Sequence, residues 1–142
     1  MKNRCLCCLL LVLTAAVCVG CAPDVMVNTM SGQSYEVKSC TFADEYANRV
    51  PEEGWEFLLV CLQGTEDDLD NIQATFFGPE SKAAVSDGTT HAECQLVVYA
   101  AGTGGRADAI LLFAVPKTFS TDFELYGPAF ESTALSAERT AE

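Results

Sequence analysis

Short apolar runs, broken by turn residues, fill the chain between residues 34 and 127. The strongest run, WEFLLVCLQ at 55–63, carries apolar side chains on both alternating faces, which predicts a central strand covered on both sides. Weaker runs predict further strands, at 34–42 with a bend near Ser39, 72–77, 83–86, 93–100, 106–115 and 119–126. No segment has a convincing helical period. Seven or so short strands with turns roughly every ten residues predict an all-β, antiparallel β-sandwich.

The first 23 residues differ from this block. Lys2 and Arg4 form a short positive region, and residues 5–22 are an almost uninterrupted apolar run that Pro23 ends. This layout is that of a secretory signal peptide, which predicts export of the rest of the chain. An uncleaved single-pass anchor and a plain secretory signal are the alternatives, and both export the chain as well.

The end of the apolar run, residues 18–21 (CVGC), resembles the lipobox of bacterial lipoprotein precursors. That family usually has leucine where this chain has Cys18. The resemblance implies cleavage before Cys21 and attachment of a diacylglyceryl group to its thiol. Since two acyl chains hold a small domain essentially permanently, we expect lipid anchoring through Cys21 at the extracytoplasmic face of the cell membrane.

The predicted organisation has four parts. Residues 1–20 are the lipoprotein signal peptide, and the short, turn-rich segment 21–33 is a tether. The sandwich domain spans 34–127. Residues 128–142 are small and polar with little apolar periodicity, which predicts a disordered tail.

The charge of the chain limits its partners. The sequence has 8 basic and 20 acidic side chains, a net charge of −12, and loss of Lys2 and Arg4 with the signal leaves 6 basic side chains and a net charge of −14. So acidic a surface repels phosphate backbones, which argues against a nucleic-acid partner. A cationic, neutral or metal-rich partner is favoured.

Three cysteines remain in the exported part besides Cys21: Cys40, Cys61 and Cys94. Their spacings match no C-x-x-C metal or redox pattern. Cys61 and Cys94 are both expected on the apolar side of their strands. They either pair across the sandwich or stay as ordinary buried thiols, and the sequence leaves both possibilities open.

Residues 66–71, EDDLDN, are the only dense carboxylate cluster, and Asp68 and Asp70 are its candidate calcium ligands. The D-x-D-x-D-G spacing of a calcium loop is absent, which favours a solvated turn. Trp55 and Phe57 could line a ligand cleft, although aromatic side chains at alternating strand positions usually belong to a core.

The single histidine, His91, could be combined with Ser81, Ser86 or Asp87 as a hydrolase constellation. The chain has no G-x-S-x-G nucleophile elbow. We therefore expect an exposed loop histidine and a protein that is not an enzyme and needs no cofactor.

Three stretches, GWEFLLV at 54–60, LLFAVPK at 111–117 and FELY at 123–126, carry a family resemblance. Together they resemble the immunoglobulin-like domain of unknown function found in many bacterial, mostly Gram-positive, cell-surface lipoproteins. The resemblance covers about residues 34–127 and implies an immunoglobulin-like sandwich and an extracellular, non-enzymatic module. The family's asparagine after the central strand is replaced here by QGT at 63–65, so its role is not carried over.

These observations predict a cell-surface lipoprotein whose non-catalytic immunoglobulin-like module binds an unidentified extracellular protein or small ligand. The alternative is an extracytoplasmic carrier or sensor that holds a small ligand or calcium at the acidic loop. Fold resemblance alone does not choose the ligand.

Overall fold

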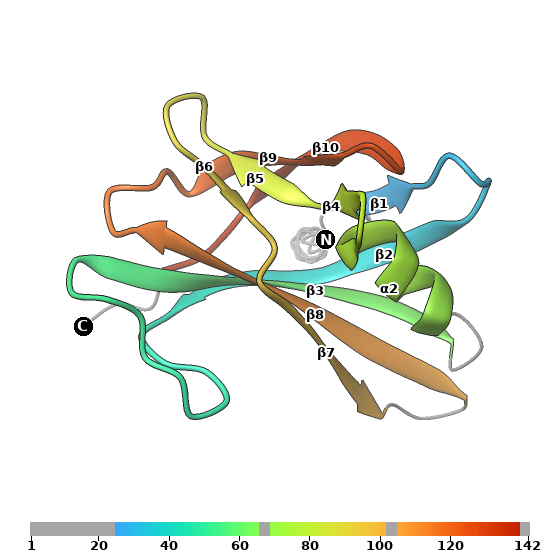
Figure 1. Ribbon diagram of the computed structural model, residues 1–142, viewed down its shortest axis with the longest axis horizontal. Coiled ribbons are helices and arrows are strands. Elements are labelled where there is room, and N and C mark those ends of the chain that lie inside the picture. The colour runs from blue at the N-terminus through green and yellow to red at the C-terminus, as the bar shows by residue number, and fades with distance from the viewer. Residues whose placement is uncertain (1–24, 66–68, 102–104, 140–142) are drawn as a thin grey trace, which may run out of the picture.

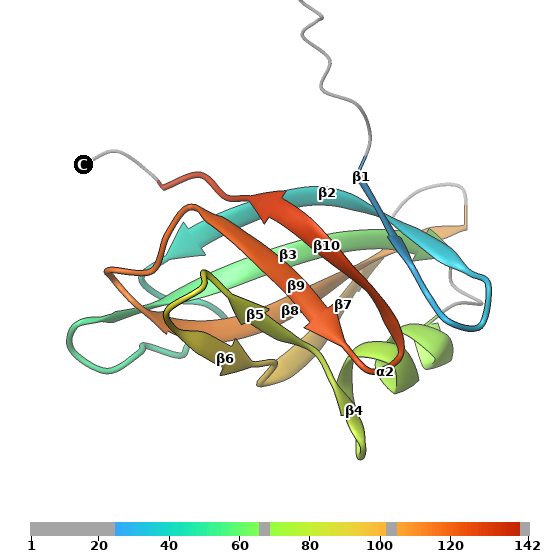
Figure 2. The same ribbon diagram turned by 90° about the horizontal axis from the view of Figure 1, so that it is seen from above.

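The computed structural model describes residues 25–65, 69–101 and 105–139 (Figure 1). Its strands are β1 Val25–Asn28, β2 Ser34–Ala43, β3 Trp55–Thr65, β4 Ser81–Lys82, β5 Ala84–Ser86, β6 His91–Glu93, β7 Leu96–Ala101, β8 Arg106–Pro116, β9 Asp122–Gly127 and β10 Phe130–Ser136, and its helix is α2 Leu69–Phe77. The strands form a five-stranded sheet, β1-β2-β3-β8-β7, and a four-stranded sheet, β10-β9-β5-β6. Neighbouring strands within both sheets run antiparallel, and Figure 2 shows the smaller sheet lying over the larger one. The prediction of an all-β sandwich is confirmed.

The central pair of the larger sheet is β3 and β8, whose register runs without interruption from Trp55 opposite Pro116 to Thr65 opposite Arg106. The inward side chains of both strands are fully buried: Leu58, Val60, Leu62, Ala109, Leu111, Phe113 and Val115. On the outer face Leu59 and Cys61 are only half-buried, because neither the smaller sheet nor α2 lies on that side. The expectation that β3 is covered on both faces therefore holds fully for its inner face, and on the outer face only at Phe57, which is buried.

The predicted bend near Ser39 is confirmed as a shift in the register between β2 and β3. Up to the shift Tyr35 is the buried residue, and after it Cys40 and Phe42 are buried. Odd positions thus face the core before the shift and even positions after it, since an extra residue reverses the alternation of a strand.

The prediction of a strand at 72–77 is wrong, because these residues lie in helix α2. Ile72 and Phe76 are four residues apart and fully buried, so one helical face enters the core. The ring of Phe76 lies 6.1 Å from that of Tyr35 and 4.8 Å from that of Phe130, measured between centroids. The helix closes one end of the sandwich, and the loop at 44–54 lies at the opposite end (Figure 1).

Both predicted flanks of the domain are also wrong. The segment predicted as a tether contains β1, which pairs with β2 and buries Val27. The segment predicted as a disordered tail contains β10, which pairs with β9. The register of β10 shifts between Phe130 and Thr133, so its buried residues Phe130 and Leu135 do not alternate in the sequence. The described domain extends from residue 25 to residue 139, and the predicted signal peptide and Cys21 lie outside the described residues.

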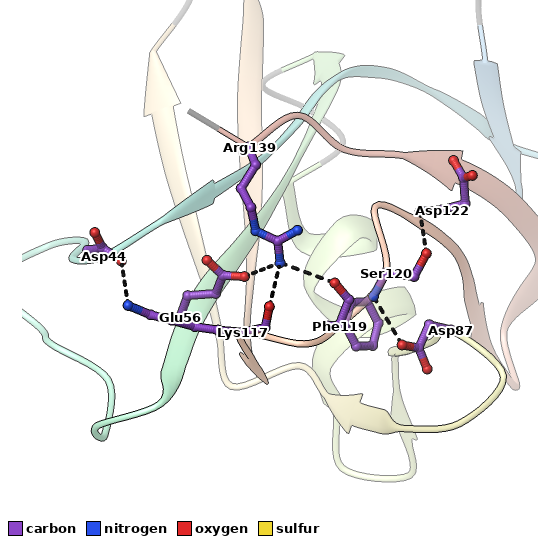
Figure 3. A network of polar contacts seen from close by, with 8 residues as sticks. All are labelled: Asp44, Glu56, Asp87, Lys117, Phe119, Ser120, Asp122 and Arg139. Carbon is purple, nitrogen blue, oxygen red and sulfur yellow. Dashed lines mark hydrogen bonds and ion pairs between the residues drawn. The ribbon is translucent and has the colours of Figure 1, made fainter. Parts of the chain in front are cut away.

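Arg139 fastens the end of the domain to three other segments (Figure 3). Its guanidinium pairs with Glu56, whose side chain is 7% exposed, and donates hydrogen bonds to the carbonyl oxygens of Lys117 at 3.3 Å and Phe119 at 3.1 Å. It also lies 4.0 Å from the ring centroid of Phe42. Because Glu56 is nearly buried, this arginine neutralises a charge that the sandwich otherwise leaves without compensation.

We expect Arg139→Gln to destabilise the domain by leaving the Glu56 carboxylate buried without its partner. Loss of one partner from a fully buried pair costs about 3–5 kcal/mol, and because Arg139 is 36% exposed we expect about 2 kcal/mol here. The free energy of unfolding, measured by chemical denaturation, checks this. Glu56→Gln in the same chain should restore part of the loss.

The matched control is Lys117→Gln, which removes the exposed ion pair between Lys117 and Asp44 at 3.7 Å. An exposed pair of this kind contributes little, so a change within about 0.5 kcal/mol is expected. Equal losses in the two variants would show that the buried carboxylate does not depend on Arg139.

Candidate functional site

A groove begins on the outer face of the larger sheet near the start of β3 and extends past the edge of that sheet to α2, β4 and β6. It consists of two hollows, of about 380 Å³ and about 590 Å³, that share Arg49, Gln95 and Ala114. Trp55 lines the first hollow, and Lys82 and His91 line the second. Both volumes lie within the range of roughly 300–1,000 Å³ that is usual for small-ligand sites. We call this feature the Trp55 groove.

Trp55 is placed in the groove by the turn that precedes β3. Gly54 adopts a positive φ of 86°, a conformation that suits glycine, and its carbonyl accepts a hydrogen bond from the Lys117 amide at 3.0 Å. The Trp55 amide donates to the carbonyl of Glu52 at 2.9 Å. The indole is 38% exposed, whereas Phe57 on the same face is 4% exposed. The sequence left two interpretations for these aromatic side chains, a ligand cleft or a packed core. Trp55 fits the ligand cleft and Phe57 fits the packed core. Phe57 nevertheless borders the hollow.

Arg49 is placed by a tight turn in the loop at 44–54. Tyr46 and Arg49 exchange both main-chain hydrogen bonds, at 3.0 and 2.9 Å, and the two residues between them, Ala47 and Asn48, have φ of 54° and 65°. Positive φ at both central residues defines a type I′ turn. Asparagine tolerates this conformation and alanine rarely adopts it, so the loop holds Arg49 in place at a local energetic cost.

The charges along the groove are not paired with one another. Within the described parts of the chain, neither Arg49 nor Lys82 forms an ion pair. The ammonium of Lys82 lies 5.4 Å from the ring centroid of Phe77. Two carboxylates, Glu52 and Glu93, also border the groove, so both signs of charge are presented to a ligand.

Another hollow, of about 760 Å³, lies between β2 and β10. Its charged and polar lining is largely paired within the protein. Lys38 and Glu36 are 3.9 Å apart, and the Ser136 hydroxyl donates to Asp122 at 2.6 Å. With fewer groups left for a ligand, it is a weaker candidate than the Trp55 groove.

The side chains considered as partners of His91 in a hydrolase site form hydrogen bonds with main-chain groups instead. Asp87 accepts hydrogen bonds from the amides of Thr89, Thr90 and Ser120, and these bonds lower its pKa. Ser86, opposite His91 in the β5–β6 pairing, accepts from the Gly88 amide at 3.1 Å, and Ser81 donates to the Ala74 carbonyl at 2.6 Å. His91 is exposed on β6 rather than in a loop, and it borders the Trp55 groove.

The candidate calcium ligands are only partly described. Asp68 lies outside the described residues, and Asp70 is exposed in the first turn of α2, where a negative charge complements the helix dipole. Among the residues that the structure describes, no three metal-binding side chains come together.

The three described cysteines, Cys40, Cys61 and Cys94, are free thiols. Burial, with a smaller contribution from Cys61, raises the pKa of Cys40 to about 12. Burial likewise raises the pKa of Cys94 to about 11, and it raises that of the half-buried Cys61. Cys61 lies on the outer face of β3, whereas Cys94 belongs to the core between the sheets. Of the two possibilities that the sequence leaves open, the structure has unpaired thiols.

Comparisons with known proteins found no matching family model, curated protein or solved structure. None of the helices in the described ranges is both long and apolar enough to cross a membrane.

Sequence reasoning missed Arg49, Lys82 and Gln95 as groove residues. They come from a loop, a two-residue strand and a strand connection that are distant in the chain. The one signal in the sequence was that basic side chains are scarce in so acidic a chain, which makes any cation without an acidic neighbour worth noting.

We expect the thiols to be alkylated in a fixed order by iodoacetamide at about pH 8, because the thiolate is the reactive form. In the native protein Cys61 should react slowly, and Cys40 and Cys94 should react only after unfolding in guanidinium. Mass spectrometry of the peptides measures this order. If Cys61 and Cys94 resist alkylation even when unfolded, until a reductant is added, the two are disulfide-bonded and the free-thiol assignment is wrong.

Proposed function

We propose that this chain is a lipid-anchored extracytoplasmic protein whose immunoglobulin-like sandwich is a non-catalytic binding module. The observation that carries the proposal is the partly exposed Trp55 that lines a hollowed, polar surface. Large aromatic side chains are costly to leave in water, and tryptophan and arginine are enriched where proteins bind their partners. The Trp55 groove combines both residue types.

The order of the strands supports the immunoglobulin-like part of the proposal. When β2, β3, β5, β6, β7, β8, β9 and β10 are lettered A, B, C, C′, D, E, F and G, the larger sheet contains A-B-E-D and the smaller one is G-F-C-C′. This is the strand order of immunoglobulin domains, with C′ added beside C. β1 is an additional strand at the edge of A, and α2 lies in the connection between B and C.

The sequence of the leader supports the anchor. The run that ends in CVGC at 18–21 has the lipobox resemblance, and β1 begins at Val25. Four residue steps from Cys21 to Val25 span at most about 14 Å. A lipid on Cys21 would hold the sandwich directly above the headgroups.

We expect Trp55→Ala to reduce ligand capture about tenfold or more, since central aromatic anchors often dominate the binding energy. The full-length protein is cross-linked reversibly on intact cells, and the captured material is quantified. Met30→Ala is the matched control, because Met30 is a 66% exposed apolar residue that does not border the groove. Equal capture by Trp55→Ala and Met30→Ala would contradict a binding role for the groove.

Cys21→Ala should release the protein from the membrane fraction, because the substitution removes the thiol that would carry the lipid. Cell fractionation and immunoblotting measure the distribution. Cys8→Ala changes another cysteine of the leader and should leave the protein in the membrane fraction. Full membrane retention of Cys21→Ala would favour the uncleaved anchor instead.

A further inference from the structure

We propose that the Trp55 groove binds an acidic oligosaccharide, a chain of pyranose sugars that carry carboxylates. This inference rests on the proposed function and names its ligand class. Three features of the groove support it: an exposed aromatic face, polar side chains with planar groups, and cations that have no acidic partner within the described chain.

Trp55 provides the aromatic face. One side of a pyranose ring presents C–H bonds, which are apolar and slightly positive, and the face of an indole is slightly negative. The two stack while the sugar hydroxyls remain at the rim. Phe57, at 4% exposure, and Pro51 support the floor and wall beside the indole.

Planar polar side chains line the same hollows and could reach the hydroxyls of a sugar bound there. Arg49 and Gln95 border both hollows, and Glu52 borders the hollow of Trp55. A guanidinium and an amide donate hydrogen bonds, and the amide and a carboxylate accept them, so together they match hydroxyls that do both.

The cations indicate a negatively charged sugar rather than a neutral one. Arg49 lies between the two hollows, and Lys82 is in the second. A guanidinium without an acidic partner is suited to bidentate binding of a carboxylate. Glu52 and Glu93 flank these cations, so a carboxylate is favoured only where it reaches Arg49 or Lys82 directly.

An extended peptide fits the groove less well, because it would bind through main-chain hydrogen bonds to a free strand edge. Four main-chain amides at the groove are already bonded within the protein: Arg49 to Tyr46, Trp55 to Glu52, Cys94 to Ala83 and Gln95 to Leu112. A strand edge borders only the second hollow, where the three-residue strand β6 ends the smaller sheet. The hollow of Trp55 offers side chains instead of a strand edge, which suits a glycan.

The test is a fluorescence titration, since Trp55 is the only tryptophan of the chain and its emission reports on the groove alone. The full-length lipidated protein is kept in a polyoxyethylene detergent, which contains no sugar. The probes are a galacturonic acid trimer, a neutral cellotriose of the same length, and short polyglutamate as an acidic peptide. We expect a saturable change with the acidic trimer and a much weaker one with the other two.

Arg49→Gln should weaken binding of the acidic trimer about tenfold, because it removes the charge and the bidentate donor. Arg106→Gln is the matched control: this arginine is exposed at the far end of the β3–β8 pair and hydrogen-bonds Gln63. Binding to Arg106→Gln should be unchanged. Trp55→Ala, followed by calorimetry, should abolish binding while thermal unfolding shows that the variant is folded.

No response to the acidic trimer, an equal response to cellotriose, or a response to polyglutamate alone would each overturn the proposal. The proposed function fails separately. If capture on intact cells depends on Trp55 but the trimer does not bind, the module binds a ligand of another class. If capture does not depend on Trp55, both proposals fall.

Discussion

The pairing of β3 with β8 is the constraint on which the other features depend. The two strands lie at the centre of the larger sheet, and their inward side chains form the middle of the core. Burial of these side chains supplies the main stabilisation of a small sandwich. Because successive residues of a strand point to opposite faces, the register that buries Leu58 also directs Phe57 and Leu59 outward. The outer face is thus fixed by the same pairing that builds the core.

The first residues of β3 make contacts on both faces of the sheet. On the inner side Glu56 is paired with Arg139, and on the outer side Trp55 enters the groove. A buried ion pair contributes little net stability against an apolar alternative, but it fixes geometry, because each partner is costly to leave alone. The last described residue of the chain therefore helps to position the residue next to the indole. The Trp55 groove depends on contacts that are distant from it in the sequence.

The alternation of apolar residues was sufficient to predict β2, β3, β5, β8 and β9, and even the bend near Ser39. The single strand predicted at 93–100 is instead divided between β6 of the smaller sheet and β7 of the larger one. The prediction failed where alternation is broken or absent. In β10 the register shift separates Phe130 and Leu135 by an odd interval, and the strand resembles a polar tail. In α2 the residues Ile72, Thr75, Phe76 and Phe77 are β-branched or aromatic, so composition favoured a strand, while the single i, i+4 pair of a nine-residue helix gave too weak a period.

The candidate site was predictable only in part. Trp55 and Phe57 share an alternating strand face, and the sequence already placed them as possible cleft residues. The position of Arg49 depends on two residues of positive φ, of which Ala47 gives no signal. Lys82 and Gln95 enter the groove through the connections between the two sheets, and no local pattern encodes such a contact.

The net charge of the chain affects which anions the groove would bind. A charge of −12 repels anions at long range, but at physiological ionic strength this field is screened beyond about 8 Å. Direct contacts with Arg49 or Lys82 act within that distance. In the proposed binding, an anion that does not fit the groove would be repelled without compensation, and one that fits would gain contacts that screening reduces much less. The acidic surface would then contribute to selectivity by excluding poorly fitting anions, and direct contacts with Arg49 or Lys82 would decide which one is retained.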